Sequence, residues 1–526
     1  MKRLICQLVL AIPMTVMGLL CSAQDSSSAP PSPVCALESL PDLPDVTITS
    51  VTEESDLAPH CKVAGVIGTE TNFELLLPDS WNGKFVMGGG GGFVGSVINV
   101  ALMYGALQAG YATVGTDTGH QGHPLDASWA LNNLERVVSF GHQAVHRTAV
   151  AAQALTSAYY GQDASRNYFI GCSRGGGQAL MEAQRYSDDF DGIVAGAPAY
   201  NWTHELGARN AWVNQAMYPD PDDLSVAVIG PEETELIGNA VMDQCDRLDG
   251  LEDGILNNPL QCNFDVSSLA CDEGKTNACL TDQEVEAARR IYDDLHDQDG
   301  LIFPGMPPGG ELSPGGWARW LTGGLDLQQE LSEFQEGAAS DSDFPAPVTP
   351  SAHFAFGNGV MKYLVFHDPD WSYVDYSVET FRSDVATVAP TLNATDPDLT
   401  AFRERGGKLL IWTGWSDMAL SPLGTIDYFE QVLKHDASAS EDVRLIMMPG
   451  VDHCAGGVGP HWVNYLDEID KWVETGDAPG QMTAYWLDDQ MQPDGSRPVC
   501  AYPSYVKYNG TGDPRDASNF TCERKE

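Results

Sequence analysis

The stretch Gly171-Cys172-Ser173-Arg174-Gly175 decides our interpretation of the fold. It follows the apolar run Tyr168-Phe169-Ile170 and precedes a helix-compatible run over residues 178–183. A Gly-x-Ser-x-Gly pentapeptide between a strand and a helix is the setting of a nucleophile elbow, where glycines keep the backbone clear and the hydroxyl stands above the sheet. Because the pentapeptide alone also occurs in ordinary turns, the inference depends on the flanking strand and helix.

Strands and helices alternate on both sides of this stretch. Strands are expected at 84–87, 111–117, 191–198, 408–413 and 443–448, and helices at 142–160, 425–433 and 461–473. Such alternation predicts an α/β fold with a parallel sheet, preceded by short β-prone runs between residues 35 and 77. The alternation stops between about 200 and 395, a segment rich in Gly, Pro, Asp and Trp.

We interpret that segment as a long insertion that covers the functional edge of the sheet as a lid. A separate tandem domain is the alternative. The expected organisation is a signal peptide at 1–23, a flexible linker at 24–34, the first part of the core at 35–200, the lid at 201–395 and the second part of the core at 396–526.

The composition excludes several classes of function. Among 526 residues, 28 are Lys or Arg and 74 are Asp or Glu, which gives a formal net charge of −46. A surface this acidic repels nucleic-acid phosphates and anionic lipids, so we expect neither nucleic-acid nor membrane binding. The acidic residues are scattered along the chain and indicate a solvated surface, for which a saline habitat is one hypothesis.

The N-terminus has the pattern of an export signal. Lys2 and Arg3 precede an apolar stretch from Leu8 to Leu20, and small residues lead to Ala23. We expect cleavage after Ala23 and a secreted or periplasmic protein. A lipoprotein signal at Cys21 is the alternative, although Leu20 is large for such a signal.

Ten cysteines remain after the expected cleavage, and in an exported chain they imply up to five disulfides. Their pairing does not follow from their positions alone. Free buried thiols or a metal cluster are the alternatives, but the chain has no C-x-x-C pair.

Two later strands end at candidate partners for Ser173. Asp417 follows the strand at 408–413, and His453 follows the strand at 443–448. Ser, then Asp, then His, each after a strand, is the chain order of hydrolases built on this kind of sheet. Histidine can take the serine proton near neutral pH, and the carboxylate orients the imidazole. Singly, Asp417 could be a turn residue and His453 a surface histidine; their order favours a Ser173–His453–Asp417 triad.

Backbone N–H groups are the expected donors to an oxyanion. The N–H of Arg174 follows the nucleophile, and the strand at 84–87 runs into a glycine-rich loop containing Gly90, Gly91 and Gly92. The glycines let backbone approach a ligand closely, although the loop could also be a turn without a role in the site.

The cysteines next to the triad residues give a further prediction. Cys172 precedes Ser173, and Cys454 follows His453. A working triad brings these two cysteines together, so we predict a Cys172–Cys454 disulfide.

These motifs resemble the tannase and feruloyl esterase family, which also includes bacterial mono(2-hydroxyethyl) terephthalate hydrolases. The resemblance is carried by Gly-Cys-Ser-x-Gly-Gly at 171–176, by Gly-Trp-Ser-Asp ending at Asp417, and by His453-Cys454, with further similar blocks at 116–120, 189–198 and 424–428. It runs from about Cys35 to Cys522. It implies an α/β-hydrolase fold with a lid and hydrolysis of esters of aromatic acids.

Arg174 departs from the family pattern, in which Thr, or Glu in the terephthalate-type enzymes, often follows the nucleophile. Its guanidinium could alter the choice of acyl group. Aromatic residues of the lid are candidates to stack on an aromatic acyl ring, although core packing explains most aromatic residues. These are Phe354, Phe356, Phe366 and Trp371.

The resemblance also implies a structural Ca²⁺ ion in the lid and no organic cofactor. Its ligands would be the carboxylates of Asp246, Asp249 and Asp253 and the carbonyls of Leu251 and Ile255. Oxygen ligands suit this ion, but an Asp/Gly loop is often only a turn, and the spacing is not that of an EF-hand. The remaining cysteines would pair as Cys245 with Cys262, Cys271 with Cys279, Cys500 with Cys522, and Cys35 with Cys61.

We therefore expect a secreted serine esterase that cleaves feruloyl, galloyl or terephthalate-type esters through an acyl-enzyme, as a monomer or weak oligomer. A serine peptidase on the same fold and a catalytically silent binding protein are the alternatives.

Overall fold

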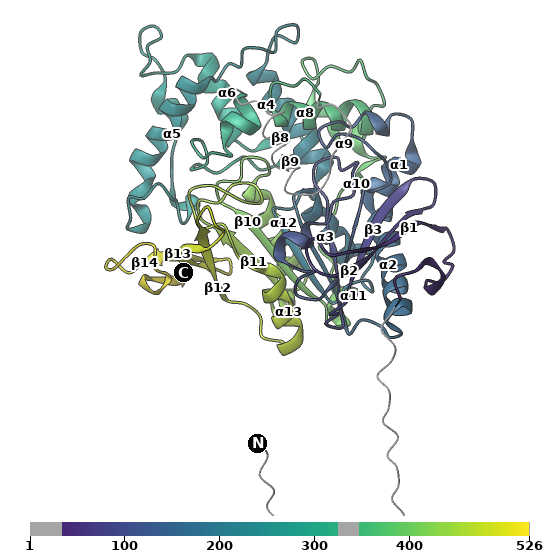
Figure 1. Cartoon of the computed structure of the whole chain (residues 1–526). Helices are drawn as coiled ribbons and strands as arrows, with labels where there is room; N and C mark the ends of the chain where they lie inside the picture. Colours follow the sequence, from purple (N-terminus) through teal and green to yellow (C-terminus); the bar gives the residue numbers. More distant parts are fainter. Residues whose placement is uncertain (1–33, 324–346, 525–526) are drawn as a thin grey trace, which may run out of the picture. The chain divides into compact units, whose positions relative to one another are not determined.

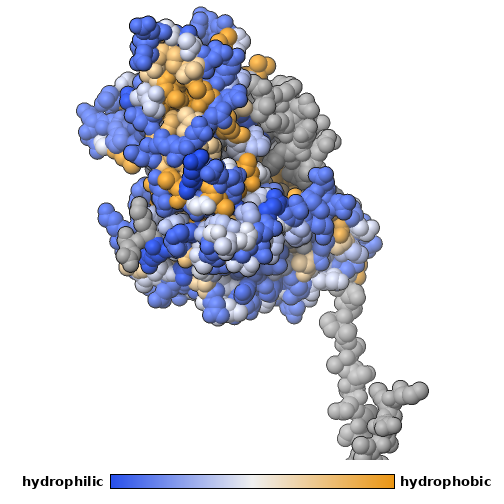
Figure 2. All heavy atoms as spheres, turned by 90° about the vertical axis from the view of Figure 1, so that its left-hand side faces the viewer, coloured by the Kyte–Doolittle hydropathy of each residue, from blue (hydrophilic) through white to orange (hydrophobic). Residues whose placement is uncertain are grey.

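The computed structural model describes residues 34–323 and 347–524. The expected signal peptide and nearly all of the linker lie outside these residues. No helix in the part of the chain that is described combines the length and apolar character needed to cross a membrane. Figure 2 shows one face of the molecule, largely hydrophilic, with hydrophobic residues gathered in its upper part.

A nine-stranded sheet forms the centre of the fold, with strand order β1-β2-β3-β5-β4-β6-β7-β10-β11. The strands from β5 to β11 in this order pair in parallel, whereas β1, β2 and β3 pair antiparallel at one edge. The bounds are β1 (Val46–Glu54), β2 (His60–Ile67), β3 (Thr71–Pro78), β4 (Lys84–Gly88), β5 (Ala112–Thr116), β6 (Arg166–Cys172), β7 (Gly192–Gly196), β10 (Lys408–Gly414) and β11 (Val443–Met448).

The parallel strands are apolar because both of their faces are buried. Successive residues point to opposite faces of a strand. In β6, Phe169 belongs to the core that contains α2 (Ala144–Tyr160), α3 (Arg174–Arg185) and α12 (Pro422–His435), whereas Ile170 belongs to the core with α13 (Tyr465–Thr475). The sheet is therefore covered by helices on both faces (Figure 1), as in an α/β-hydrolase fold.

The segment expected as a lid adds no strand to this sheet within the described residues. It forms α4 (Asn210–Met217), α5 (Pro231–Cys245), α6 (Asp282–Tyr292), the hairpin β8–β9 (Leu295–Asp297 and Gly300–Phe303), α8 (Ala352–Gly359), α9 (Phe381–Val385) and α10 (Ala389–Leu392). Several of these helices share a separate core that includes Ile237, Ile291 and Trp317. In Figure 1 the lid helices lie together above one end of the sheet.

The structure differs from the expected elements near the C-terminus. The helix expected from His461 begins at Tyr465, because Asn464 caps it through the N–H of Asp467 and Trp462 pairs with Tyr485 instead. Two small sheets then follow outside the main sheet, β12–β13 (Gln481–Leu487 and Pro493–Cys500) and β14–β15 (Ser504–Tyr508 and Phe520–Arg524). Besides α9 and α10 of the lid, two further short α-helices are α1 (Leu134–Val138) and α11 (Thr400–Glu404).

Candidate active site

Ser173 occupies the sharp turn between β6 and α3. Its backbone has φ 60° and ψ −122°, a conformation that non-glycine residues rarely adopt. The turn is fixed on both sides, since Ser173 N–H donates to the Gly196 carbonyl over 3.0 Å and the Ser173 carbonyl accepts from Gly177 N–H over 3.1 Å. A strained residue held in this way is what a nucleophile elbow requires.

Two glycines allow this turn to pack tightly. A Cβ atom at Gly171 would lie 2.5 Å from the Gly175 carbonyl carbon, and one at Gly89 would lie 2.6 Å from the Gly175 Cα. The backbone of the glycine-rich loop after β4 therefore packs directly against the backbone of the elbow.

Asp417 and His453 form a hydrogen-bonded pair after β10 and β11. His453 Nδ1 lies 2.9 Å from Asp417 Oδ2, and the Asp417 side chain is fully buried. Asp417 Oδ1 accepts from the N–H groups of Ala419 and Leu420 over 2.9 and 3.0 Å. Because Nδ1 faces the carboxylate, Nε2 is the imidazole nitrogen left to take a proton.

His353 of the lid supports the turn that holds Asp417. Its Nε2 lies 2.9 Å from the Ala419 carbonyl, and burial lowers the pKa of His353 to about 3. The neutral His353 imidazole donates to the Ala419 carbonyl and so holds Ala419, whose own N–H donates to Asp417.

The structure contains a Cys172–Cys454 disulfide, which spans 282 residues of sequence. It links the residue before Ser173 to the residue after His453. The other four disulfides are Cys35–Cys61, Cys245–Cys262, Cys271–Cys279 and Cys500–Cys522, the pairs expected from the sequence.

Ser173 and His453 line the same small cavity, of about 20 Å³. Its wall is mostly apolar and includes residues from the core and the lid: Gly92, Arg174, Ala199, Trp202, Leu206, Trp320, Phe356, Ala419 and Leu420. The arrangement places a hydroxyl and an imidazole beside an aromatic wall.

Of the four lid aromatics expected near the acyl group, Phe356 lines this cavity. Phe354 lies two residues earlier on α8 and therefore points elsewhere, against Tyr218 and Tyr373. Phe366 and Trp371 stack on each other, with ring centroids 5.7 Å apart, and are not among the lining residues.

Sequence reasoning missed Trp202 and Trp320. The Trp320 ring meets the His453 ring edge-on, with centroids 5.2 Å apart. Trp202 follows β7 at the same edge of the sheet as Ser173, so its position after a strand was the available signal. Trp320 offered none, because it lies in the short π-helix Ala318–Thr322 of the lid, which no sequence pattern predicted.

Arg174 is buried and its guanidinium turns towards the π-helix at Ser139–Gln143. It donates to the carbonyls of Phe140 and Gly141 and lies 5.3 Å from the centroid of Trp202. Burial lowers the pKa of Arg174 to about 9. Arg174 thus lines the cavity while its guanidinium is bonded to carbonyl groups of the π-helix.

The glycine-rich loop supplies fewer free donors than its sequence suggests. Gly90 N–H donates to the side chain of Gln178 over 3.0 Å, while the Gly90 carbonyl accepts from Gly175 N–H. Gly92 lines the cavity. The N–H of Gly90 is therefore already used, whereas Gly92 lies beside Ser173.

In the loop expected to bind calcium, two carboxylates accept hydrogen bonds from backbone N–H groups of the same segment. Asp246 accepts from Gly254 N–H over 3.0 Å, and Asp249 accepts from the N–H of Leu251 and Asn257 over 3.0 and 3.1 Å. Carboxylate oxygens are the donors that Ca²⁺ prefers, but Asp246, Asp249 and Asp253 do not form one of the groups of described residues whose ligand atoms lie within 4.8 Å of one another. Asp253 also contacts Arg497, whose Nη2 lies 2.6 Å from its Oδ2.

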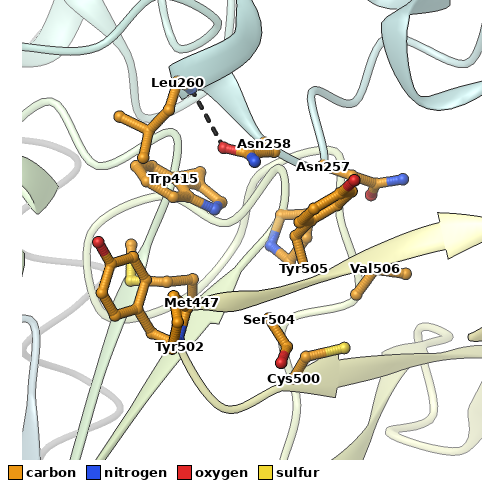
Figure 3. A pocket seen from close by; sticks show the side chains of 12 residues that line it. Asn257, Asn258, Leu260, Trp415, Met447, Cys500, Tyr502, Ser504, Tyr505 and Val506 are labelled. Atoms are coloured by element: carbon orange, nitrogen blue, oxygen red, sulfur yellow. Dashed lines mark hydrogen bonds between the residues drawn. The ribbon is translucent and has the colours of Figure 1, made fainter. Parts of the chain in front are cut away.

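A second cavity, of about 120 Å³, lies beside Trp415 and the C-terminal strands (Figure 3). Tyr502, Tyr505 and Asn258 contribute to its wall, and Asn258 Oδ1 accepts from Leu260 N–H over 3.2 Å. Ser173 and His453 are not among its lining residues.

The sheet and the turn at Ser173 are those of an α/β-hydrolase fold, and the family match identifies the chain as a carboxylic ester hydrolase. The chain belongs to the tannase and feruloyl esterase family, whose model matches residues 55–523.

Relatives of this family match nearly the whole chain. A mono(2-hydroxyethyl) terephthalate hydrolase from Piscinibacter sakaiensis is 31% identical over 89% of this chain and 85% of its own. Feruloyl esterase B from Aspergillus niger is 29% identical over 88% of this chain and 86% of its own. The crystal structure of feruloyl esterase B from Aspergillus oryzae has a TM-score of 0.80 at 26% identity, covering 92% of this chain and 97% of that one.

Proposed function

We propose that this protein is a secreted serine esterase that cleaves esters of aromatic acids through a Ser173–His453–Asp417 triad. The observation that supports it most is the 2.9 Å Asp417–His453 contact, together with the disulfide that ties His453 to Ser173 through their neighbours. Each group lies after a strand of one sheet, so all three meet at one edge.

His453 Nε2 takes the proton of the Ser173 hydroxyl as the oxygen attacks the ester carbonyl carbon. The alkoxide of the ester then leaves with that proton, and an acyl-Ser173 ester remains. Water attacks the acyl-enzyme in the same way, which releases the acid and restores the Ser173 hydroxyl. Asp417 holds the imidazole in the tautomer with the proton on Nδ1 and stabilises its charged form.

The negative charge that develops on the carbonyl oxygen is bound by backbone N–H groups of Arg174 and of Gly91 or Gly92. A donor of this kind contributes about 3–4 kcal/mol to transition-state stabilisation in comparable sites. Such groups are fixed before the substrate arrives, because the Arg174 N–H begins α3 and the glycine loop packs against the elbow.

The aromatic wall supports an aromatic acyl group as substrate. Trp202, Trp320 and Phe356 line the cavity next to Ser173 and His453. The names of the relatives point to ferulate and terephthalate monoesters, and the family name adds gallate. Arg174 acts on acyl selection through the position of Trp202, which its guanidinium touches.

A substrate panel tests this function. Methyl ferulate, methyl gallate and mono(2-hydroxyethyl) terephthalate are compared with a peptide substrate, and Ser173→Ala serves as control. We expect hydrolysis of at least one aryl-acid ester and loss of it in the variant. Cleavage of peptides alone would favour a serine peptidase. A folded protein that a fluorophosphonate probe does not label at Ser173 would favour a binding protein.

Export and calcium binding belong to the same proposal. The chain is expected to be cleaved after Ala23, which N-terminal sequencing of the mature protein tests, and to carry one Ca²⁺ in the loop from Asp246 to Ile255. The acidic composition supports a protein that binds neither nucleic acid nor membranes. We further propose a monomer or weak oligomer, which light scattering at several concentrations tests.

A further inference from the structure

A second group of side chains with metal-binding chemistry lies away from the cavity. It comprises His146 on α2, Glu182 on α3 and Asp189 in the loop before β7. Each offers one ligand atom, and the three atoms lie within 4.8 Å of one another. None of the three lines the cavity beside Ser173.

Glu182 is the unusual member of this group. It is 1% exposed, and neither of its carboxyl oxygens has a hydrogen-bond donor among the residues that the structure describes. A buried polar group without a hydrogen-bond partner destabilises the fold, and an unpaired buried charge destabilises it more. Burial and the neighbouring carboxylate of Asp189 raise the pKa of Glu182 well above its ordinary value.

His146 provides a nitrogen at the same place. Its Nδ1 lies 2.6 Å from Asp189 Oδ2, and its ring stacks on Tyr186 with centroids 3.9 Å apart. The His146 side chain is 33% exposed, so an ion and a water ligand can reach the group from solvent. Two ligands of a tetrahedral Zn²⁺ lie about 3.3 Å apart, so the His146–Asp189 contact has to widen by only about 0.7 Å.

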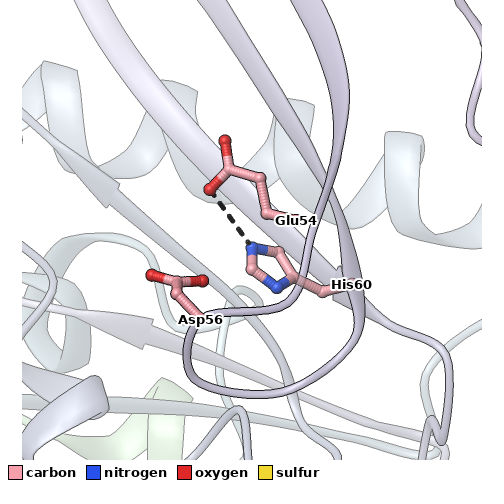
Figure 4. Close-up of side chains that lie close together, drawn as sticks. All are labelled: Glu54, Asp56 and His60. Atoms are coloured by element: carbon pink, nitrogen blue, oxygen red, sulfur yellow. Dashed lines mark ion pairs between the residues drawn. The ribbon is translucent and has the colours of Figure 1, made fainter.

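A second cluster of similar composition serves as a comparison. Glu54, Asp56 and His60 lie close together at the turn between β1 and β2 (Figure 4). His60 Nδ1 is already 2.7 Å from the Ala58 carbonyl, its Nε2 faces Glu54 over 3.9 Å, and Asp56 is exposed to water. Because its polar groups are satisfied or solvated, this cluster carries no proposal.

We propose that His146, Glu182 and Asp189 bind a divalent transition-metal ion, Zn²⁺ being the best match to one imidazole and two carboxylates. The open coordination position is filled by water. The ion takes the place of the proton between His146 Nδ1 and Asp189, the neutral imidazole carries its ring proton on Nε2, and one carboxylate oxygen of Glu182 is the third protein ligand. The ion joins α2 to α3, the helix that follows Ser173, so we expect it to stabilise the fold.

The test measures Zn²⁺ binding to the mature protein kept in excess Ca²⁺, by calorimetry and by metal analysis after dialysis. We expect one Zn²⁺ per chain, a higher Tm with Zn²⁺, and proton release on binding. Glu182→Gln and the partly exposed His146→Gln should each weaken binding beyond the roughly 10- to 100-fold that loss of an outer-shell partner costs. Asp56→Asn in the comparison cluster should bind like the wild type.

Two results would overturn the proposal. If the wild-type protein binds no Zn²⁺, Glu182 and Asp189 instead share a proton. If His146→Gln and Glu182→Gln both bind as the wild type does, the ion lies elsewhere. Since none of these readouts uses ester hydrolysis, failure of this proposal is distinguishable from failure of the proposed function.

Discussion

Cys172 and Cys454 are bonded to each other and flank Ser173 and His453, although 282 residues separate them in the sequence. In the chain-entropy model, a loop of this length gives the disulfide a stabilising effect of about 5.6 kcal/mol. We predict that Cys172→Ala/Cys454→Ala lowers both the free energy of unfolding and kcat, because the His453 loop is no longer tied to the elbow. Urea unfolding and steady-state kinetics measure the two effects.

Cys271→Ser/Cys279→Ser is the matched control. This pair closes a separation of 8 residues in the lid, so the same model gives about 2.5 kcal/mol. Its kcat should stay unchanged. If both double variants keep full kcat, the Cys172–Cys454 disulfide stabilises the fold without positioning His453.

Asp417→Asn should lower kcat by about 10⁴-fold with little change in KM, because the amide favours the wrong tautomer of His453. The fold should survive, since the side-chain oxygen can still accept from Ala419 and Leu420. Circular dichroism checks the fold, and initial rates on an aryl ester measure kcat.

Asp452→Asn tests whether a second carboxylate next to His453 takes this role. Asp452 binds Ser313 and the N–H of Gly315 in the lid, the latter over 2.8 Å, and not the imidazole. Its kcat should fall far less than that of Asp417→Asn. A larger loss of kcat in Asp452→Asn than in Asp417→Asn would mean that Asp452, and not Asp417, orients His453.

The sequence predicted the parts of the site that follow regular strands. The order of Ser173, Asp417 and His453 could be inferred because apolar runs mark β6, β10 and β11, and parallel strands end at one edge of the sheet. The disulfides followed from the triad and from the family resemblance.

The walls of the cavity could not be predicted in the same way. Phe354 and Phe356 are two positions apart on one helix, and only the packing of α8 shows which ring reaches the cavity. Trp320 lies in the short π-helix Ala318–Thr322, whose position depends on tertiary contacts. The use of Gly90 N–H by Gln178 likewise depends on contacts between residues 88 positions apart.

Phe356→Ala and Phe354→Ala form a pair that tests the aromatic wall. Loss of Phe356 should lower kcat/KM for an aryl-acid ester about tenfold, equivalent to ~1.4 kcal/mol of ring contact, while hydrolysis of an acetate ester changes little. Phe354→Ala removes a ring from the lid core, so it should lower Tm without changing the ratio of the two activities. Equal ratios in both variants would contradict a role for Phe356 in binding the acyl ring.

Calcium removal should lower the Tm of the wild-type protein. An ion bound only by the folded state adds about 2.7 kcal/mol at 100 times its Kd. Asp249→Asn removes one carboxylate of the loop, so a chelator should no longer change its Tm. Asp272→Asn, at an exposed lid position, should respond like the wild type. A wild-type Tm that is independent of both chelator and added Ca²⁺ would refute the site.

Glu205 should make stability depend on pH near neutrality. It is buried, accepts from Ser421 N–H over 2.6 Å, and burial raises its pKa to about 8, with Asp417 adding to the effect. Between its ordinary pKa of about 4.5 and this value, the folded state holds a proton that the unfolded state has lost. Its contribution to stability is therefore complete below about pH 4.5 and is lost as the pH rises to 8, by at most ~1.4 kcal/mol per pH unit.

Glu205→Gln keeps an acceptor for Ser421 and has no proton to lose, so its free energy of unfolding should decline less than that of the wild type between pH 6 and 8. Urea titrations at each pH measure the difference, and the exposed Glu232→Gln should reproduce the wild-type slope. The same slope in all three proteins would mean that Glu205 is ionised in the folded state. In that case the positive charge of Arg209, which lowers the pKa of Glu205, offsets the effect of burial.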